Sequence, residues 1–178
     1  EMLARMPANL TFEQAAAVPT SASTALQALR AGGVESGQQV LIVGASGGVG
    51  MFAVSIAKSF GGTVTGVCST AKLDLVRSLG ADHVIDVRTS RFEELGADVD
   101  VVLDTIGGDT QDRSFAVLKP GGVLVSAVSE PDQQKAARRG VRALFFLVDV
   151  SSRRLESIGA LIEAGELRTR VGEVLPLA

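Results

Sequence analysis

The stretch VLIVGASGGVG, residues 40–50, decides the fold of this chain. It opens with four apolar residues, three of them β-branched, a pattern typical of a strand that is covered on both faces. Glycines follow at positions 44, 47 and 50, and apolar residues then recur at helical spacing to residue 60. This order predicts a tight turn that leads the backbone from a buried strand directly into a helix.

The same alternation of strands and helices continues along the chain. We expect strands at 40–43, 63–68, 83–86, 99–104, 123–128 and 141–148, helices at 49–60, 70–79, 111–118 and 151–164, and a turn at 119–122. Such alternation is typical of parallel βαβ units and predicts an α/β fold, a Rossmann-type doubly wound parallel sheet of about six strands.

Residues 1–32 have a different pattern. Thr11 and Gln14 fit a capping box, and Pro19 interrupts before a second helix that we expect to run to Arg30. We therefore predict that residues 1–178 form a single domain with a helical lead-in over residues 1–32.

The composition excludes several classes of site. The chain has one cysteine, Cys68, one histidine, His83, and neither Tyr nor Trp. An intrachain disulfide is therefore excluded, and a conventional zinc site could be built only with carboxylates as additional ligands. The net charge of −3 argues against a broad nucleic-acid-binding face, and no apolar run approaches the roughly 18 residues of a membrane span. We expect no metal site, no nucleic-acid partner and no membrane partner, and the single cysteine fits the reducing cytoplasm.

The glycine turn has the residues that bind a phosphate group. Glycine lets the chain reverse sharply, lets the backbone approach a pyrophosphate without a Cβ in the way, and lets the helix pack close to the strand. Free amides and the helix dipole at the start of the helix then face the anion. Gly44, Gly47 and Gly50 form a G-x-x-G-x-x-G variant of the usual G-x-G-x-x-G pattern. We predict that this turn, with Ser46 inside it, binds a dinucleotide; a tight turn without a ligand is the alternative.

The residues after the second expected strand indicate which dinucleotide is bound. NAD-specific sites usually place Asp or Glu there to bind the ribose 2′-hydroxyl. In this chain no acidic residue occurs between Glu35 and Asp74. Because a carboxylate would repel a 2′-phosphate, its absence favours NADPH, with Ser69, Thr70 and Lys72 as donors. For Lys72 the alternative is an ordinary solvated helix residue.

Two further segments lie where open α/β sheets bind ligands, at the carboxyl ends of strands. These weaker candidates, with ordinary loop chemistry as the alternative, are Asp104, Thr105 and Ile106 after the fourth strand and Ser126, Ala127 and Val128 at the end of the fifth. Cys68 is expected to be a small buried strand residue, and His83 has no obvious partner. We therefore assign no catalytic residue to this chain.

Five stretches of the chain resemble one protein family. They are AAAVPTSASTALQAL (15–29), VLIVGASGGVG (40–50), STAKLDLVRSLGADHVID (69–86), VDVVLDTIGG (99–108) and LKPGGVLVS (118–126). In order, and over nearly the whole chain, they look like the zinc-independent medium-chain dehydrogenase/reductases, in the quinone oxidoreductase or zeta-crystallin-like branch. The resemblance implies zinc-independent, NADPH-dependent reduction of a quinone or of an α,β-unsaturated carbonyl compound.

The resemblance also implies roles for individual residues. Gly47, Gly48, Val49 and Gly50 would hold the pyrophosphate, Ser69 and Lys72 the 2′-phosphate, Thr24 would lie near the nicotinamide, and Ser126 to Val128 would line the nicotinamide ribose. The family often has Tyr after the Asp of the third strand, in the 2′-phosphate site. This chain has Val87 at that position, and we expect Arg88 to substitute.

Members of this family also carry an N-terminal catalytic domain. The resemblance therefore implies that this chain is the nucleotide-binding part of a longer two-domain reductase and is inactive alone on its small-molecule substrate. Phe145 and Phe146 would add an apolar wall to the substrate pocket, with core packing as the alternative. The strand at 141–148 is apolar and expected at the sheet edge, which predicts a homodimer across it.

Two other functions stay open at this point. One is a non-catalytic module that binds NADPH in a structural or regulatory protein. The other is an enoyl reductase domain of a multidomain acyl synthase, acting on carrier-bound acyl chains.

Overall fold

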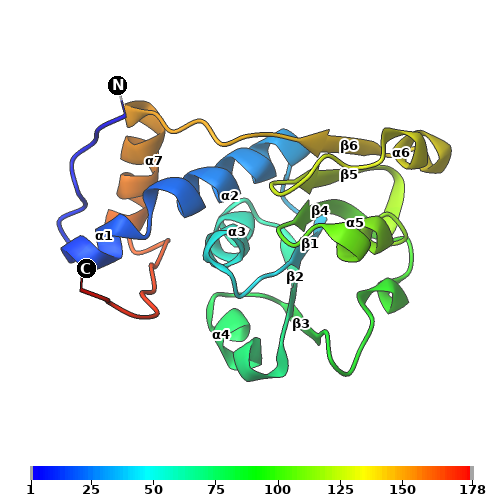
Figure 1. Cartoon of the computed structure of the whole chain (residues 1–178), viewed down its shortest axis with the longest axis horizontal. Helices are drawn as coiled ribbons and strands as arrows, with labels where there is room; N and C mark the ends of the chain where they lie inside the picture. The colour runs from blue at the N-terminus through cyan, green and yellow to red at the C-terminus, as the bar shows by residue number, and fades with distance from the viewer. Residues whose placement is uncertain (1, 177–178) are drawn as a thin grey trace.

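The computed structural model describes residues 2–176, which fold around one six-stranded sheet (Figure 1). The strands are β1 (Gln39–Val43), β2 (Thr63–Cys68), β3 (His83–Asp86), β4 (Val99–Asp104), β5 (Leu118–Ser126) and β6 (Arg142–Phe145). All neighbouring pairs are parallel, and the strand order is β3-β2-β1-β4-β5-β6. The prediction of an α/β, Rossmann-type doubly wound sheet is confirmed.

Helices cover both faces of the sheet and connect its strands. They are α1 (Phe12–Ala16), α2 (Pro19–Gly32), α3 (Gly48–Ser59), α4 (Leu73–Ser78), α5 (Gly108–Ser114), α6 (Gln133–Arg139) and α7 (Ser152–Glu163), with two 3₁₀ turns, η1 (Thr70–Lys72) and η2 (Phe92–Leu95). Within residues 2–176, no helix combines the length and the apolar character needed to cross a membrane. The strand order reverses at β1, because β4 follows β3 in sequence but pairs with the other side of β1. In a doubly wound sheet this reversal opens a ligand crevice at the carboxyl ends of β1 and β4.

β1 lies between two apolar layers, which explains its uninterrupted run of apolar residues. Val40 and Ile42 pack into a first core cluster with α2, α3 and α7, whereas Leu41 and Val43 pack into a second cluster on the opposite face. All four side chains are at most 1% exposed. The first cluster contains the inner faces of α2 and α3, so these helices fix the turn between β1 and α3 against the sheet.

The N-terminal lead-in begins with the capping box that the sequence predicts. The Gln14 amide donates to Thr11 Oγ1 at 3.3 Å, and the Thr11 amide donates to Gln14 Oε1 at 2.9 Å. Pro19 stands in the first turn of α2, where its missing N–H costs no hydrogen bond, and α2 continues to Gly32 rather than ending at Arg30. Figure 1 shows α1 near α7 at one end of the molecule, and α2 running from there to the sheet.

The segment at 119–122 lies within β5, not before it as predicted. The register of β4 and β5 passes from Val99–Leu118 directly to Val101–Val123, so the extra residues of β5 bulge out of the ladder. Gly121 has a φ of +81°, which fits the Pro-Gly turn predicted for these residues. The turn therefore forms, but as an interruption inside a continuing strand.

Two expected elements are shorter in the structure. The helix expected at 111–118 is α5, which ends at Ser114, since Leu118 already pairs with β4. The strand expected at 141–148 ends at Phe145, and the residues after it leave the sheet. β6 does lie at the edge of the sheet, as predicted.

Candidate cofactor-binding site

The turn between β1 and α3 requires glycine at its first position. Gly44 has a φ of +83°, in the left-handed region that favours glycine. A Cβ on Gly44 would also come within 2.3 Å of Thr105 Oγ1, which donates a hydrogen bond to the Val43 carbonyl at 2.7 Å. The Thr105 hydroxyl thus ties the loop after β4 to the end of β1, in space that only glycine leaves open.

Gly50 brings α3 against this turn. A Cβ at position 50 would lie 2.2 Å from the Gly44 carbonyl oxygen and 2.8 Å from the Ala45 Cα, and both are backbone atoms. α3 begins at Gly48 with Gly47 as its N-cap, and it has neither a capping side chain nor an acidic residue in its first turn. Its first amides and the positive end of its dipole are therefore open to an anion at the crevice.

A cavity of about 330 Å³ opens beside the turn. Its walls come from the carboxyl ends of β1 and β2 and from the segments that follow β3 and β4. The lining residues are mostly apolar or hydroxyl-bearing: Val43, Gly44, Ser46, Val67, Cys68, Ser69, Val87, Ser90, Phe92, Ile106, Thr110 and Arg113. Of the residues predicted to bind cofactor, Gly44, Ser46, Ser69 and Ile106 are in this wall. A mainly apolar cavity with a few polar groups is typical of a small-molecule site.

The residues predicted to bind a 2′-phosphate gather near the end of β2. Ser69 lines the cavity. Lys72 and Arg88 are exposed, and neither forms an ion pair with a carboxylate within residues 2–176. These two cations can therefore pair with an anionic ligand.

Thr70 lies beside the Asp86 carboxylate at the end of β3. Its hydroxyl hydrogen-bonds to the Asp86 carboxylate, and this bond, followed by one from the Arg88 amide at 2.9 Å, lowers the pKa of Asp86. The register of β2 and β3 pairs Asp86 with Cys68, so a carboxylate does lie beside the end of β2. The sequence argument missed it because Asp86 belongs to the next strand.

The single cysteine lines the cavity, whereas the single histidine does not. Cys68 is a buried strand residue, as predicted, and burial first and the Asp86 charge second raise the pKa of its thiol. The thiol therefore stays protonated and is a poor nucleophile. His83 is exposed at the start of β3. In the part of the chain that the structure describes, no group of three or more His, Cys, Asp or Glu residues could hold a metal ion.

Asp104 and Ser126, which the sequence places among the cofactor-binding candidates, are both completely buried. Asp104 Oδ1 accepts hydrogen bonds from the amides of Ile106 and Gly107, both at 3.0 Å. Its Oδ2 accepts from Ser126 Oγ and from Gln111 Nε2, both at 3.1 Å. Asp104 and Ser126 therefore act on the crevice by fixing the loops after β4 and β5.

Those two loops present the remaining candidates. β5 ends at Ser126, so Ala127 and Val128 lie in the following loop and not in the strand expected there. Ile106 and Val128 are 56% and 48% exposed. A Cβ on Gly107 would lie 3.4 Å from Val128 Cγ1, which shows that the loops are neighbours. Ile106 therefore lines the cavity with its side chain partly exposed, and the exposed Val128 lies on the neighbouring loop.

The other predicted residues do not line the cavity. Thr24 is buried in α2, and its hydroxyl donates to the Thr20 carbonyl at 2.8 Å. Phe146 packs against the first core cluster, whereas Phe145 is 38% exposed on the edge strand. For Phe146 the alternative interpretation, core packing, is the one that the structure supports.

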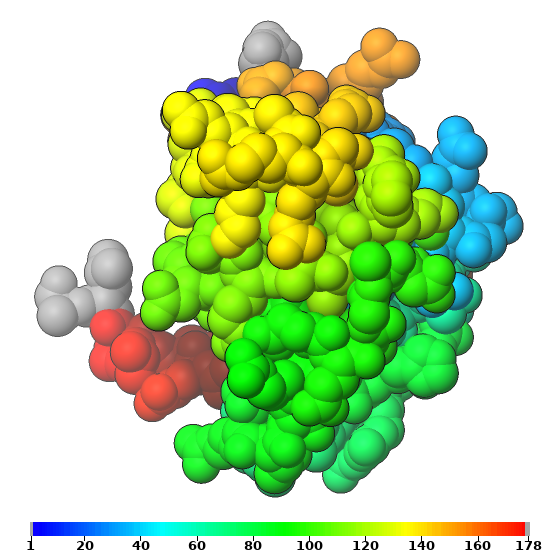
Figure 2. Space-filling view, turned by 90° about the vertical axis from the view of Figure 1, so that its right-hand side faces the viewer, coloured from blue at the N-terminus to red at the C-terminus, as the bar shows by residue number. Residues whose placement is uncertain are grey.

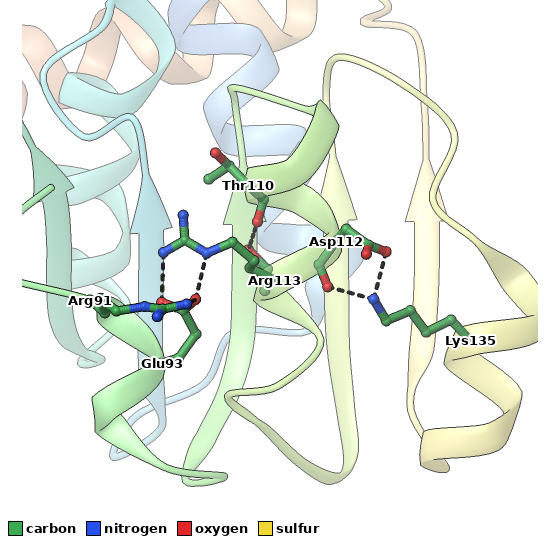
Figure 3. Close-up of polar contacts among 7 residues, drawn as sticks. Arg91, Glu93, Thr110, Asp112, Arg113 and Lys135 are labelled. Atoms are coloured by element: carbon green, nitrogen blue, oxygen red, sulfur yellow. Dashed lines mark hydrogen bonds and ion pairs between the residues drawn. The ribbon is translucent and has the colours of Figure 1, made fainter.

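Sequence reasoning missed the most polar part of the cavity wall. Arg113 of α5 lines the cavity and forms a bidentate ion pair with Glu93 of η2 (Figure 3). The hydrogen bonds from Arg113 are the largest cause that lowers the pKa of Glu93 to about 2. The two residues are 20 positions apart in the sequence. Glu93 belongs to η2, which precedes β4, and Arg113 belongs to α5, which follows it. No local pattern in the sequence signals such a pair.

Comparison with known proteins identifies the family. Residues 79–178 match the family described as zinc-binding dehydrogenase. The chain therefore belongs to the zinc-binding dehydrogenase family. It is 36% identical over 193 residues to a probable zinc-binding oxidoreductase, mitochondrial, of Arthroderma benhamiae, a match that covers 98% of this chain and 58% of that protein.

Two further relatives show the breadth of this dehydrogenase family. The chain is 41% identical over 183 residues to the spectinabilin polyketide synthase system protein NorB of Streptomyces orinoci, covering 94% of this chain and 8% of that protein. The structure of the quinone oxidoreductase from Coxiella burnetii matches with a TM-score of 0.83 and 34% identity, covering 89% of this chain and 51% of that one. The predicted membership of the medium-chain dehydrogenase/reductases is confirmed. The chain spans about half the length of the Arthroderma oxidoreductase and of the Coxiella enzyme.

Replacing Gly50 by Ala should disrupt the turn. The new Cβ meets backbone atoms, so α3 must move away from β1, and we expect the free energy of unfolding to fall by about 2 kcal/mol, as at other overpacked sites. Urea denaturation measures the change. Gly48→Ala is the matched control, because its Cβ would meet only the Ser21 side chain, with Oγ at 3.0 Å, which can rotate away. Equal losses in both variants would contradict the role given to Gly50.

The Glu93–Arg113 ion pair should resist acid. The pKa of Glu93 in the folded protein, about 2, lies below its ordinary value of 4.5. The contribution of the pair to stability is therefore fully present above pH 4.5 and is lost as the pH falls through 2. Carboxyl-carbon NMR should give Glu93 a titration midpoint near 2, and Arg113→Gln should return the midpoint toward 4.5. A midpoint near 4.5 in the unmodified protein would show that the pair does not form in solution.

Proposed function

We propose that this chain is the NADPH-binding domain of an oxidoreductase that transfers hydride, without zinc, to a quinone or to an α,β-unsaturated carbonyl compound. The observation that carries the proposal is the uncapped start of α3, behind a turn where Gly44 and Gly50 leave no Cβ and beside a cavity of about 330 Å³. Open amides, a helix dipole and close backbone approach together suit a pyrophosphate. When bound, NADPH supplies hydride from nicotinamide C4, and the protein supplies binding and orientation.

The two halves of the cofactor would occupy different parts of the crevice. The amides at the start of α3 hold the pyrophosphate, and the adenosine enters the cavity. Ser69, Lys72 and Arg88 then surround the 2′-phosphate. Neither Lys72 nor Arg88 forms an ion pair within residues 2–176, so both can offer positive charge to the additional phosphate of NADPH, with the Asp86 carboxylate as the opposing charge nearby.

The nicotinamide would lie at the mouth of the crevice. Ile106 and Val128 present exposed apolar surface there, which would pack on the nicotinamide and exclude water from the path of the hydride. The loops that carry them are held by Asp104, so they present a fixed surface. Zinc independence and the choice of substrate are supported by the resemblance to the quinone oxidoreductase branch, and the rest of the substrate pocket belongs to the remainder of the whole reductase.

An enoyl reductase domain of a multidomain synthase is the second candidate. The 41% identity to NorB, over only 8% of that protein, favours it. The same cofactor site and the same hydride donor would serve, and the acceptor would be the double bond of a carrier-bound acyl chain. A non-catalytic module would bind NADPH at the same place but without turnover in the whole protein.

We also propose a homodimer across β6. This strand has no partner on its outer side within residues 2–176, and Phe145 and Leu147 beside it are 38% and 82% exposed. Light scattering should give twice the mass of one chain, and Phe145→Asp should give monomers because it places a charge in the joined edge. Leu3→Asp, at an equally apolar but distant exposed position, should leave the dimer intact. A monomeric unmodified chain would overturn this proposal.

Titration with NADPH and with NADH tests the cofactor, and the absence of Trp leaves the nicotinamide fluorescence unobscured. We expect tighter binding of NADPH, and we expect Lys72→Gln to weaken NADPH about tenfold without changing NADH, because only NADPH carries the 2′-phosphate. Lys119→Gln is the control, since Lys119 lies near the amino end of β5, away from the crevice. Equal or tighter binding of NADH would contradict the proposal.

A further inference from the structure

Arg113 is the only charged residue that lines the cavity in the described part of the chain. A free cation at that position would attract a phosphate, in competition with Lys72 and Arg88. Its surroundings decide whether it acts in this way or in another.

The charge of Arg113 is already paired within the protein. Its Nε and Nη2 bond to the two carboxylate oxygens of Glu93, the second at 2.7 Å, and Figure 3 shows the two groups side by side. Its Cζ lies 4.8 Å from the centre of the Phe92 ring, which is itself buried in the second core cluster. Arg91 Nη2 approaches the same Glu93 oxygen at 3.4 Å. The guanidinium is therefore fixed along one edge by a carboxylate and supported by an aromatic ring.

The part of the Arg113 guanidinium that stays exposed is planar, and its charge is balanced by Glu93. Its side chain is 41% exposed, whereas that of Glu93 is 18% exposed, so the arginine and not the carboxylate is the accessible member of the pair. Nη1 has no acceptor among residues 2–176. Figure 2 shows the face on which α5 and the segment around η2 meet, below α6 and β6. A planar guanidinium whose charge is balanced packs well against a purine ring, but it is a poor ligand for a phosphate.

The position of Arg113 in the cavity agrees with a contact to the base. Gly44 and Ser46 form the part of the wall next to the pyrophosphate turn, and Ser69 forms the part next to Lys72. Arg113, Phe92 and Thr110 come from η2 and α5, the elements on either side of β4. A nucleoside whose pyrophosphate lies at α3 and whose 2′-phosphate lies at Ser69 would direct its base toward this third part of the wall.

We propose that Arg113 packs against the adenine ring of the cofactor and determines its affinity, with Glu93 as the positioning residue that holds the guanidinium in place. The proposal rests on the proposed dinucleotide function and adds a residue to it. The cationic side chains of the site then have two different roles. Lys72 and Arg88 distinguish NADPH from NADH, whereas Arg113 contributes equally to the binding affinity for both.

Titration of variants against four probes tests the assignment. Arg113→Gln should weaken NADPH, NADH and 5′-AMP by a similar factor, about tenfold, as expected for the loss of one stacking contact to a base. Reduced nicotinamide mononucleotide, which has no adenine, should bind with unchanged affinity. Arg113→Lys keeps the positive charge but lacks the planar guanidinium, so it should lose as much affinity for these three ligands as Arg113→Gln does. Thermal unfolding of each variant confirms that it is folded.

Glu93→Gln tests the positioning role. It frees the guanidinium, so we expect a smaller loss for all adenine-containing probes, and the double variant Glu93→Gln/Arg113→Gln should lose no more than Arg113→Gln alone. Arg91→Gln is the matched control, because Arg91 contacts the same carboxylate but does not line the cavity. It should leave every affinity unchanged.

The outcomes separate this inference from the proposed function. If the unmodified chain binds neither NADPH nor NADH, the proposed function fails and this inference fails with it. If both bind and Arg113→Gln changes neither, only this inference is overturned. A loss confined to NADPH would make Arg113 a phosphate ligand, and full affinity in Arg113→Lys would show that its charge rather than its plane matters; either result overturns the assignment.

Discussion

The buried carboxylate of Asp104 holds the crevice in shape. Moving a carboxylate away from water is costly unless hydrogen bonds replace the lost hydration, and Asp104 is 0% exposed. Its hydrogen bonds come from the loop after β4, from Ser126 at the end of β5 and from Gln111 in α5. Gln111 in turn donates to the carbonyl and the hydroxyl of Ser129. A shift of any one of these segments would leave a charged or polar group unpaired in the interior, so the segments keep a common position.

The two sides of the crevice depend on this anchor in different ways. Toward β1, the fixed loop after β4 carries Thr105, whose hydroxyl donates to the Val43 carbonyl and lies where a Cβ on Gly44 would collide with it. Toward the outer wall, Gln111 and Arg113 belong to the same short helix, so the network that fixes one also places the other. One buried acid thus links the glycine turn after β1 to the wall that we propose for the base.

The layout of the sheet could be predicted from sequence, because a strand that is buried on both faces, such as β1, consists of consecutive apolar residues. The glycine turn could be predicted for a related reason: close backbone approach leaves glycine as the only acceptable residue at positions such as 50. The start of β5 could not be predicted. Pro120 and Gly121 have the pattern of a turn between elements, but β5 pairs with β4 on both sides of them, at Leu118 and again from Val123. A strand boundary depends on the neighbouring strand, which a local pattern does not contain.

The chemistry of individual side chains was the least predictable part. Asp104 and Ser126 were correctly placed at the carboxyl ends of strands, but whether a polar group faces a ligand or the protein depends on partners far away in sequence. Thr70 met Asp86 because β2 and β3 are neighbours in the sheet. Glu93 and Arg113 form their ion pair although the whole of β4 separates them in the sequence. Contacts between elements, and not the residues themselves, decide which polar groups remain open to a cofactor.

The bulge in β5 has a consequence for the pairing along the sheet. The extra residues at 119–122 are absorbed at the amino end of the strand, and pairing from Val101–Val123 to Asp104–Ser126 is undisturbed. Pro120 and Gly121 are exposed there, on the side of the sheet opposite the crevice. The bulge therefore accommodates the extra residues of β5 at that end while the carboxyl ends keep their alignment. The sheet thereby confines its irregular pairing to one end and keeps regular pairing at the end that the buried Asp104 holds in place.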